Sequence, residues 1–316
     1  MAIDRESIYK RLEAGAKTYA CGGFIQTLDP IHRYEIFSEL CFDRLKRKCD
    51  YIDDVFRRYN CDWLQTIYHM LFRSLDVGQN RQAYESLSDI ARFKILQREG
   101  FDSITTEALL FGTAGLLTTL NEDNYIKQLK EEFDFLAHKY DLSVVSLKQW
   151  NRRRITASKH PLIRLSQMVN FLANKGLSME AICQCSEIKD IEKMFRVSAK
   201  QYWCEIANPS TSQFPLPVYI GYDKIDLFGI NFVVPLQLSY ASYTANDTLS
   251  AKAISLLESI RAENNHYTRS WASFGVKVRN AFESQAMIQL ASEYCDKKRC
   301  SECPVAKVMV ANAAKR

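Results

Sequence analysis

The chain has 316 residues, of which 47% are hydrophobic and 25% are charged, and its formal net charge is +5. This length is enough for one large domain or two ordinary domains, and the hydrophobic fraction can form a core, so a largely disordered chain is excluded. With 11 Gly and 7 Pro, the chain has too few turn residues for an all-β protein, and its composition favours helices.

The N-terminal segment and the apolar runs indicate the compartment. Charged residues are scattered through residues 1–23, which therefore lack the apolar stretch of a secretory signal. No apolar run reaches the length that spans a bilayer. We expect a cytoplasmic protein with no membrane partner, whose ten cysteines stay reduced. Clustered cysteines in such a protein are candidates for metal or redox chemistry.

Apolar residues recur at helical spacing along most of the chain. The small residues Gly112, Ala114 and Gly115 predict a close approach by a neighbouring helix. The apolar segment 225–243 contains Pro235 and predicts a kinked helix at the centre of a bundle. The other predicted helices lie at residues 1–20, 34–59, 61–75, 81–98, 103–118, 122–139, 161–175, 178–185, 187–197, 249–261, 264–274 and 284–294.

The distribution of prolines predicts a boundary. Residues 207–223 hold three of the seven prolines and predict an exposed loop. This loop separates an N-terminal helical region, residues 1–206, from a C-terminal helical region, residues 224–316, that ends in a cysteine cluster. The predicted fold class is all-α, a multi-helix bundle of successive helical hairpins that can divide into two lobes.

Three of the ten cysteines, Cys295, Cys300 and Cys303, lie close together in the sequence YCDKKRCSECPV. The Cys-x2-Cys spacing lets two thiolates reach one zinc ion at Zn–S distances of ~2.3 Å, and Cys295 is near enough to supply a third. A Cys-x4-Cys-x2-Cys pattern followed by proline also suits part of an iron–sulfur site. The alternative interpretation is three reduced cysteines in a tight helical turn.

A closed metal site needs a fourth ligand. Cys183 and Cys185 would point to different faces of one helix, which argues against a shared ion. The thiolate form of Cys300 or Cys303 would gain stability from the N-terminus of a helix that begins at Pro304. By sequence, the candidates for the fourth ligand are Cys21, Cys183, Cys185, Cys204 and His266.

The most basic stretch of the chain is WNRRRITASKHPLIR, residues 150–164. Guanidinium groups bind phosphate through two parallel hydrogen bonds, a helix N-terminus adds donors, and an indole ring can stack on a base. The alternative is a solvated loop with a few ion pairs. The candidate residues for binding phosphate or nucleic acid are Trp150, Arg152, Arg153, Arg154, Lys159 and Arg164.

The common catalytic motifs are missing from the sequence. There is no Gly-x-Ser-x-Gly, no His-Glu-x-x-His, no Walker loop and no dinucleotide fingerprint, and the five histidines are scattered. A cysteine nucleophile beside a spatially adjacent histidine stays open, but no residue is singled out for that role. We therefore do not expect an enzyme.

Several segments resemble an uncharacterised bacterial family, domain of unknown function 2851. The resemblance extends from about residue 20 to residue 310, and its last segment is the most specific. The segments are EALLFGTAGLL, QWNRRRITASKHPLIRLSQM, VVPLQLSYASY, SIRAENNHYTRSWASFGV and SQAMIQLASEYCDKKRCSECPV.

The resemblance implies a partner and a cofactor. Longer members of the family carry an N-terminal part that is similar to a PD-(D/E)XK nuclease core, and the acidic pair and lysine of such a core are missing here. The resemblance therefore implies a helical companion of a nuclease without the nuclease chemistry. By analogy with RecB-like nucleases, it also implies an iron–sulfur site formed by Cys21, Cys295, Cys300 and Cys303.

The family pattern also bears on the basic stretch. It implies functional roles for Arg154, Pro161 and Arg164. In this chain RRRITASKHP replaces the family's Arg-Pro-x-x-x-Pro arrangement, which changes the geometry expected for the loop.

Two hypotheses about function follow. The first is a cytoplasmic helical module that binds nucleic acid or phosphate through residues 150–164, has zinc or an iron–sulfur cluster near its C-terminus, and acts with a nuclease-like chain. The second is a helical scaffold or protein-interaction domain without a ligand.

Overall fold

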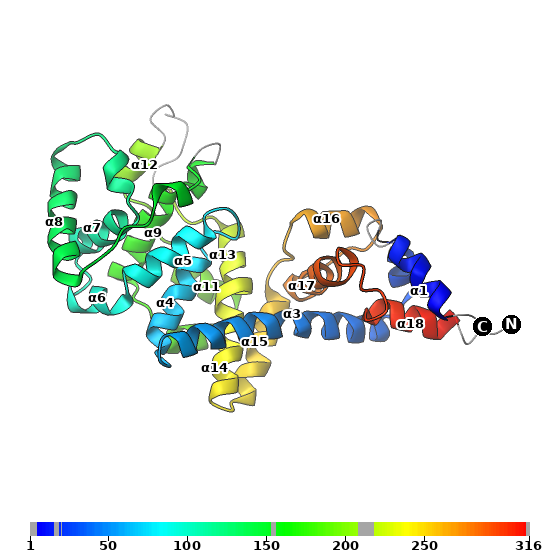
Figure 1. Ribbon diagram of the computed structural model, residues 1–316. Helices are drawn as coiled ribbons and strands as arrows, with labels where there is room; N and C mark the ends of the chain where they lie inside the picture. The colour runs from blue at the N-terminus through cyan, green and yellow to red at the C-terminus, as the bar shows by residue number, and fades with distance from the viewer. Residues whose placement is uncertain (1–4, 16–18, 20, 153–155, 208–217, 314–316) are drawn as a thin grey trace. The chain divides into compact units, whose positions relative to one another are not determined.

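The computed structural model describes residues 5–15, 19, 21–152, 156–207 and 218–313. Every regular element in these residues is a helix (Figure 1), and two isolated bridges, Ser198 with Tyr219 and Arg261 with Asn280, form no strand. The predicted all-α fold class is therefore confirmed. None of the helices in these residues has the length and hydropathy needed to cross a membrane.

The chain folds into two compact units. Unit 1 consists of Met1–Tyr51, Ser186–Ile188 and Gln237–Arg316, and unit 2 consists of Ile52–Cys185 and Lys189–Leu236. Unit 1 is therefore built from both ends of the sequence and unit 2 from its middle. The exposed loop predicted at residues 207–223 as the boundary between two helical regions stays a prediction, because residues 208–217 lie outside the described part of the chain.

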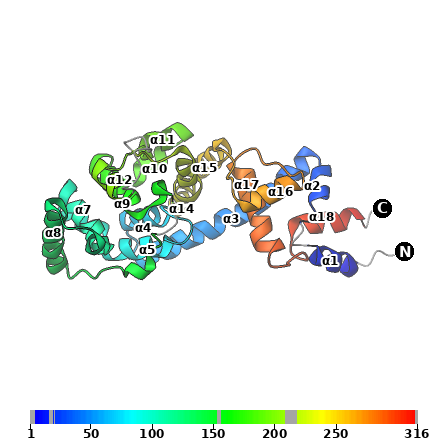
Figure 2. The ribbon, with the colours of Figure 1, turned by 90° about the horizontal axis from the view of Figure 1, so that it is seen from above.

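Unit 1 contains helices from the start and the end of the chain. Helices α15 and α16 pack on α17, and α1 packs on α18, as the two views of the ribbon show (Figures 1 and 2). Its elements are α1 (Arg5–Ala14), α2 (Gly22–Thr27), the first part of α3 (Pro30–Arg58), most of α14 (Val234–Tyr243), α15 (Asp247–Ser259), α16 (His266–Ser273), α17 (Ala281–Gln289), the π-helical turn η6 (Leu290–Cys295) and α18 (Pro304–Ala313).

Unit 2 contains most of the other helices. Helix α7 packs on α8 and α9, α4 packs on α5, and α12 packs on α9. Its elements are α4 (Trp63–Arg73), α5 (Arg81–Ile90), α6 (Phe93–Arg98), α7 (Ser103–Thr113), η2 (Leu116–Thr119), α8 (Asn124–Tyr140), η3 (Leu147–Gln149), η4 (Ala157–Lys159), α9 (Pro161–Asn174), α10 (Met179–Gln184), most of α11 (Ile188–Phe195), α12 (Gln201–Ala207), α13 (Tyr222–Phe228) and the π-helical turn η5 (Gly229–Val233).

Local chemistry explains where the helices begin and end. The Asp62 side chain accepts hydrogen bonds from the backbone N–H groups of Leu64 and Gln65 at the start of α4, because these groups have no partner within the helix. The helix predicted at 103–118 ends early, since Gly115 adopts a φ of +71° that a helix does not accommodate. The kink predicted at Pro235 stays a prediction, and the structure has a π-helical turn, η5, directly before α14 at this place.

Gly112 allows the close packing of α7 against α8. A Cβ atom built on Gly112 would overlap the ring of Phe133 on α8. The small side chain at this position is therefore required by the neighbouring helix, as the sequence EALLFGTAGLL predicts.

We expect Gly112→Ala to destabilise unit 2 by about 1–3 kcal/mol, because the added methyl group must displace a ring or a helix. The matched control is Gly221→Ala, since a Cβ atom at Gly221 meets no other atom within 4 Å. Urea denaturation of both variants measures the difference. Equal midpoints for the two variants would contradict the packing argument.

A buried polar group connects α3 and α17 within unit 1. The fully buried Gln285 side chain accepts hydrogen bonds from Arg44 Nε at 2.7 Å and Lys48 Nζ at 2.9 Å, and it donates to Glu263 at 2.9 Å. Burial, followed by the nearby charge of Arg44, lowers the pKa of Lys48 to about 7. The amine of Lys48 therefore loses its proton more readily in the folded chain than in the unfolded one.

We expect the free energy of unfolding to rise with pH between about 7 and 10. In this window the unfolded chain holds a proton on Lys48 that the folded chain has released, so the contribution is lost as the pH falls through about 7. Urea denaturation at several pH values should show a smaller rise for Lys48→Met than for the wild type. The control is Lys46→Met, at an exposed position of the same helix. Identical slopes for all three proteins would show that Lys48 titrates normally.

Candidate functional site

Four cysteines from opposite ends of the sequence meet in unit 1. Cys21, Cys295, Cys300 and Cys303 line one cavity of about 20 Å³. This is room for a particle of about the size of one water molecule. The four are the residues that the resemblance implied as ligands, and the structure brings them together, while ligation itself stays a prediction. The other lining residues are Leu12, Tyr19, Tyr294 and Ala306.

Helix ends position the cysteines around this cavity. Cys295 is the last residue of η6, and the chain then turns through Lys298, whose φ of +52° is left-handed. Cys303 lies just before α18, and Cys21 lies just before α2. The thiol sites therefore stand at one helix C-terminus and two helix N-termini.

Electrostatics at the cavity favour neutral thiols when only protein groups are considered. Burial, then the charges of Cys303 and Cys300, raise the pKa of Cys21 to about 12. Burial raises the pKa of Cys303 to about 11, against the opposing effect of hydrogen bonds from the backbone N–H groups of Ala306 and Val305. A bound cation would reverse this balance, because it stabilises every thiolate around it. The backbone donors at Cys303 already face in the direction that favours a thiolate.

The four sulfur donors are of a type that suits a metal, whereas the present arrangement of the side chains does not. Four sulfur atoms without a competing carboxylate suit zinc or an iron–sulfur cluster. In the part of the chain that the structure describes, no group of three or more His, Cys, Asp or Glu side chains is arranged to hold a metal ion. Coordination would therefore require the cysteine side chains to turn toward a common point. The cavity as it stands offers space for a single ion rather than for a cluster.

The other candidate ligands lie away from this cavity. His266 begins α16, where its ring packs on Tyr267 at 3.8 Å, and it is not among the lining residues. Cys183, Cys185 and Cys204 belong to unit 2. Cys21 is thus the fourth cysteine at the cavity. Its place beside the C-terminal cysteines does not follow from any local spacing in the sequence.

The predicted phosphate-binding residues are divided between core and surface. Trp150 is buried, with its indole N–H donating to the Ala114 carbonyl at 2.9 Å, so its ring offers no face on which a base could stack. Arg152 is partly exposed and donates to Thr119 Oγ1 at 3.0 Å, and Lys159 is exposed. Arg164 is buried. Arg153 and Arg154 lie outside the described residues.

Arg164 has a cationic neighbour that the sequence analysis missed. Lys224, near the start of α13, interacts electrostatically with Arg164, and each charge lies near Asp76. Sixty residues separate the two cations in the sequence (164 to 224). The sequence places Lys224 at the start of an otherwise apolar segment, but this position does not identify Arg164 as its neighbour.

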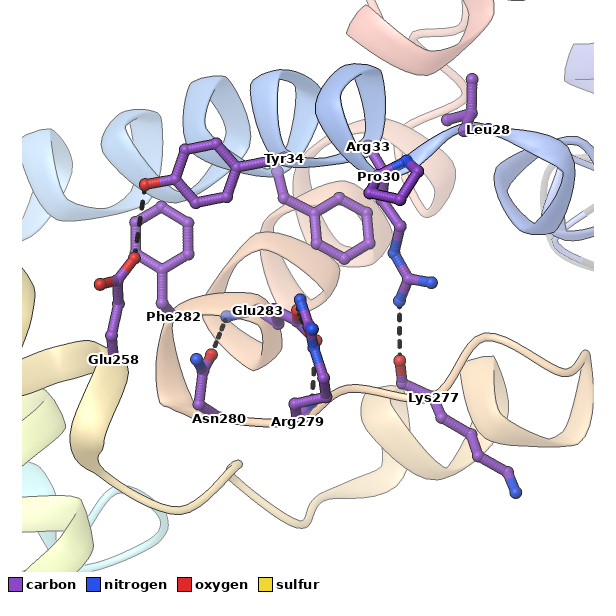
Figure 3. Close-up of a pocket in the computed structure, with 11 residues that line it drawn as sticks. Leu28, Pro30, Arg33, Tyr34, Glu258, Lys277, Arg279, Asn280, Phe282 and Glu283 are labelled. Atoms are coloured by element: carbon purple, nitrogen blue, oxygen red, sulfur yellow. Dashed lines mark hydrogen bonds and ion pairs between the residues drawn. The ribbon is translucent and has the colours of Figure 1, made fainter.

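A larger cavity of about 690 Å³ lies in unit 1 between the starts of α3 and α17 (Figure 3). The polar groups along it bind one another: Arg33 donates to the Lys277 carbonyl at 2.8 Å, and Arg279 pairs with Glu283 at 2.5 Å. The carboxylate of Glu283 is thus paired, whereas the buried Nε atom of Arg33 has no hydrogen-bond partner among the described residues. Aromatic walls are supplied by Tyr34, Phe37 and Phe282.

A histidine, a serine and an aspartate meet in the core of unit 2 without forming a catalytic relay. Nδ1 of the buried His69 faces Ser88 at 2.9 Å, Tyr59 at 3.0 Å and Asp89 at 3.2 Å. In a triad the nucleophile and the carboxylate bind different ring nitrogens. Here they share one nitrogen, and the Ser88 hydroxyl is fully buried and donates to the Glu85 carbonyl. The cluster is a structural one.

Comparison with known proteins gives a family but no characterised relative. A family model described as "Protein of unknown function (DUF2851)" matches residues 3–266, and the resemblance stated from the sequence is thereby confirmed. No curated protein and no solved structure gives a significant match. The matched range includes Cys21 and the basic stretch, and it ends before Cys295.

Proposed function

We propose that this chain, which belongs to the DUF2851 family, is a helical binding module whose unit 1 holds a metal centre on Cys21, Cys295, Cys300 and Cys303. The observation that carries the proposal is the convergence of these cysteines on one cavity. Ten reduced cysteines placed without regard to function would seldom bring the sole close-spaced triple together with a distant fourth. Four thiolates complete a tetrahedral zinc site or the ligand set of an iron–sulfur cluster.

The centre would act as a link between the two ends of the chain. Cys21 leads into α2, and Cys303 leads into α18, which packs on α1. Ligands from both segments on one ion convert the free energy of metal binding into stability of the fold. The cavity volume supports a single ion, and the cysteine spacing also supports an iron–sulfur cluster, so the metal itself has to be identified by experiment.

The test is the metal content of protein purified without oxygen from unsupplemented cells. We expect about one zinc, or several irons with visible absorption, per chain in the wild type. Cys300→Ala should lose most of the metal and destabilise unit 1 by more than about 3 kcal/mol, because metal binding contributes directly to folding. Elemental analysis, visible spectroscopy and thermal denaturation measure the three effects.

The matched control is Cys41→Ala, since Cys41 is a fully buried cysteine of unit 1 that does not line the cavity. Its metal content should equal that of the wild type. A wild-type protein without metal, in which all thiols react after unfolding, would contradict the proposal and favour the ligand-free scaffold.

A second function is proposed for unit 2, the binding of nucleic acid in the cytoplasm together with a nuclease-like chain. It is supported by the exposed Lys159, by the partly exposed Arg152 and by the family resemblance. Stacking by Trp150 is no longer part of this proposal, because that residue is buried.

We expect the double substitution of Arg152 and Lys159 by alanine to weaken binding of single- or double-stranded oligonucleotides and to lower the dependence of affinity on salt. Each phosphate contact that is lost should reduce the slope of log K against log salt by about 0.7–0.9. Fluorescence anisotropy over a salt series measures both quantities. Lys127→Ala, at an exposed position on α8, is the control for loss of charge alone. No binding by the wild type at low salt would contradict this function.

A further inference from the structure

The cavity of about 690 Å³ between the starts of α3 and α17 has the size of a ligand pocket, because such pockets commonly measure about 300–1,000 Å³. All of its lining residues belong to unit 1. Two of them, Tyr34 and Lys277, are exposed, so the cavity opens to solvent. A small molecule can therefore reach it from outside the fold.

Aromatic rings form the apolar part of the lining. Phe37 and Phe282 are buried, and the ring of Tyr34 stacks on Phe282 with 5.9 Å between centroids and 14° between planes. Tyr34 itself is 54% exposed, so a ligand that covers its ring would remove apolar surface from water. These walls suit a flat aromatic group.

Arg33 lines the cavity with most of its donors unused. A guanidinium group has five N–H donors. That of Arg33 makes one side-chain hydrogen bond within the described residues, from Nη2 to the Lys277 carbonyl at 2.8 Å, and its buried Nε atom has no partner there. The guanidinium lies 4.9 Å over the ring of Phe37, which holds it in place. Nη1 and Nη2 are therefore positioned to bind a carboxylate through two parallel hydrogen bonds.

The charges along the cavity match a single negative charge on the ligand. Three cations line it, Arg33, Lys277 and Arg279, and two carboxylates, Glu258 and Glu283, so its formal net charge is +1. Arg279 pairs with Glu283, while the other two cations form no ion pair with a carboxylate in the described part of unit 1. A monoanion makes this lining neutral, whereas a phosphate dianion would leave it negative.

Glu258, the second carboxylate, lies away from the unpaired cations. Figure 3 shows it beside Tyr34, whose hydroxyl donates to it at 3.4 Å, while Arg33 reaches toward Lys277 on the other side of the cavity. The cavity therefore has a cationic end and an acidic end. A ligand whose carboxylate lies at Arg33 and whose ring lies toward Tyr34 keeps its own charge away from Glu258.

We propose that this cavity binds an aromatic monocarboxylate, with the acid at Arg33 and Lys277 and the ring against Tyr34, Phe37 and Phe282. Arg33 supplies the two parallel donors, and Lys277 at the mouth adds a second positive charge. The volume suits a ligand with more than one ring. This site shares no lining residue with the cavity of the four cysteines, so it is independent of the proposed metal centre.

The first test compares naphthaleneacetate, its neutral amide and acetate by calorimetry. We expect the aromatic acid to bind and the amide to bind at least about 10-fold more weakly, because the amide lacks the charge that pairs with Arg33. Acetate should not bind measurably, since it has no ring to bury. Equal binding of the acid and the amide, or no binding of the acid, would overturn the proposal.

Variants locate the carboxylate. Arg33→Met should weaken binding of naphthaleneacetate about 10- to 100-fold, and Arg33→Lys should lie between that variant and the wild type, because lysine keeps the charge without the fork. Lys277→Met should weaken binding about 3-fold, since solvent screens an exposed charge. Lys46→Met, at an exposed position of α3 outside the cavity, should bind like the wild type. Binding by a folded Arg33→Met variant that equals the wild type would contradict the proposal.

Arg33→Met also removes the hydrogen bond to the Lys277 carbonyl, so a readout on the wild type covers the case in which this variant does not fold. Benzoylphenylacetate, a photoreactive aromatic acid, should cross-link to residues 28–37 or 277–283, as identified by peptide mass spectrometry. An excess of naphthaleneacetate should prevent this cross-link. Cross-links confined to other segments, or cross-links that the competitor leaves unchanged, would refute the site.

The carboxylate can come from a free aromatic acid or from the C-terminus of a peptide that ends in an aromatic residue. A tetrapeptide ending in phenylalanine is therefore compared with its C-terminal amide and with naphthaleneacetate. Preference for the free tetrapeptide over both other probes supports the site with a peptide end as ligand. Tighter binding of naphthaleneacetate than of either peptide supports the site with a free acid as ligand.

Discussion

The packing of the first helices of the chain against its last ones is the constraint on which unit 1 depends. Tyr19 packs its ring on Trp271 at 4.3 Å, and the backbone of Gly22 comes so close to Phe274 that an added Cβ atom would lie 3.2 Å from it. Helix α1 packs on α18 in the same unit. Because these contacts join residues far apart in the sequence, they also determine that Cys21 lies beside the C-terminal cysteines.

Two buried charged groups of unit 2 differ in how their hydrogen bonds are satisfied. In unit 2 the buried carboxylate of Glu107 is satisfied, since it accepts a hydrogen bond from Tyr125 at 2.6 Å and from the indole of Trp203, and pairs with Lys200. Arg164 in the same unit donates to Gln167 at 3.0 Å and has the charge of Asp76 nearby, but its buried Nε atom has no hydrogen-bond partner among the described residues.

The sequence predicted the helices well where local chemistry decides them and less well where tertiary contacts do. Asp62 and the apolar run after it place the start of α4 without further information. The predicted helix at 81–98 is instead two helices, because Ala91 leaves the helical conformation and Phe93 donates its backbone N–H to the side chain of Gln65. That contact lies 28 residues away in the sequence, so no local pattern contains it.

In the candidate sites, too, local sequence determines some features and tertiary contacts determine the others. Cys300 and Cys303 are close in the sequence, and their position before Pro304 indicates a helix N-terminus, which the structure has. The neighbourhood of Cys21 follows from how unit 1 is assembled. The sequence places Trp150 and Arg164 in a basic stretch that suggests a surface, but the structure buries both. The Trp150 ring packs on Tyr84 at 5.0 Å, and Arg164 interacts electrostatically with the same tyrosine.

The sequence by itself determined the all-α class, most helix positions, the family and the close spacing of three cysteines. These features depend on hydrophobic periodicity, on capping residues and on the closeness of residues within the sequence, all of which act over a few turns of helix. Only the tertiary structure decided that the two ends of the chain share one unit, that a fourth cysteine joins the cluster, and that Lys224 lies beside Arg164. Contacts of that kind depend on which apolar faces bury one another, and the free energy of that burial is summed over the whole unit rather than set by any one segment.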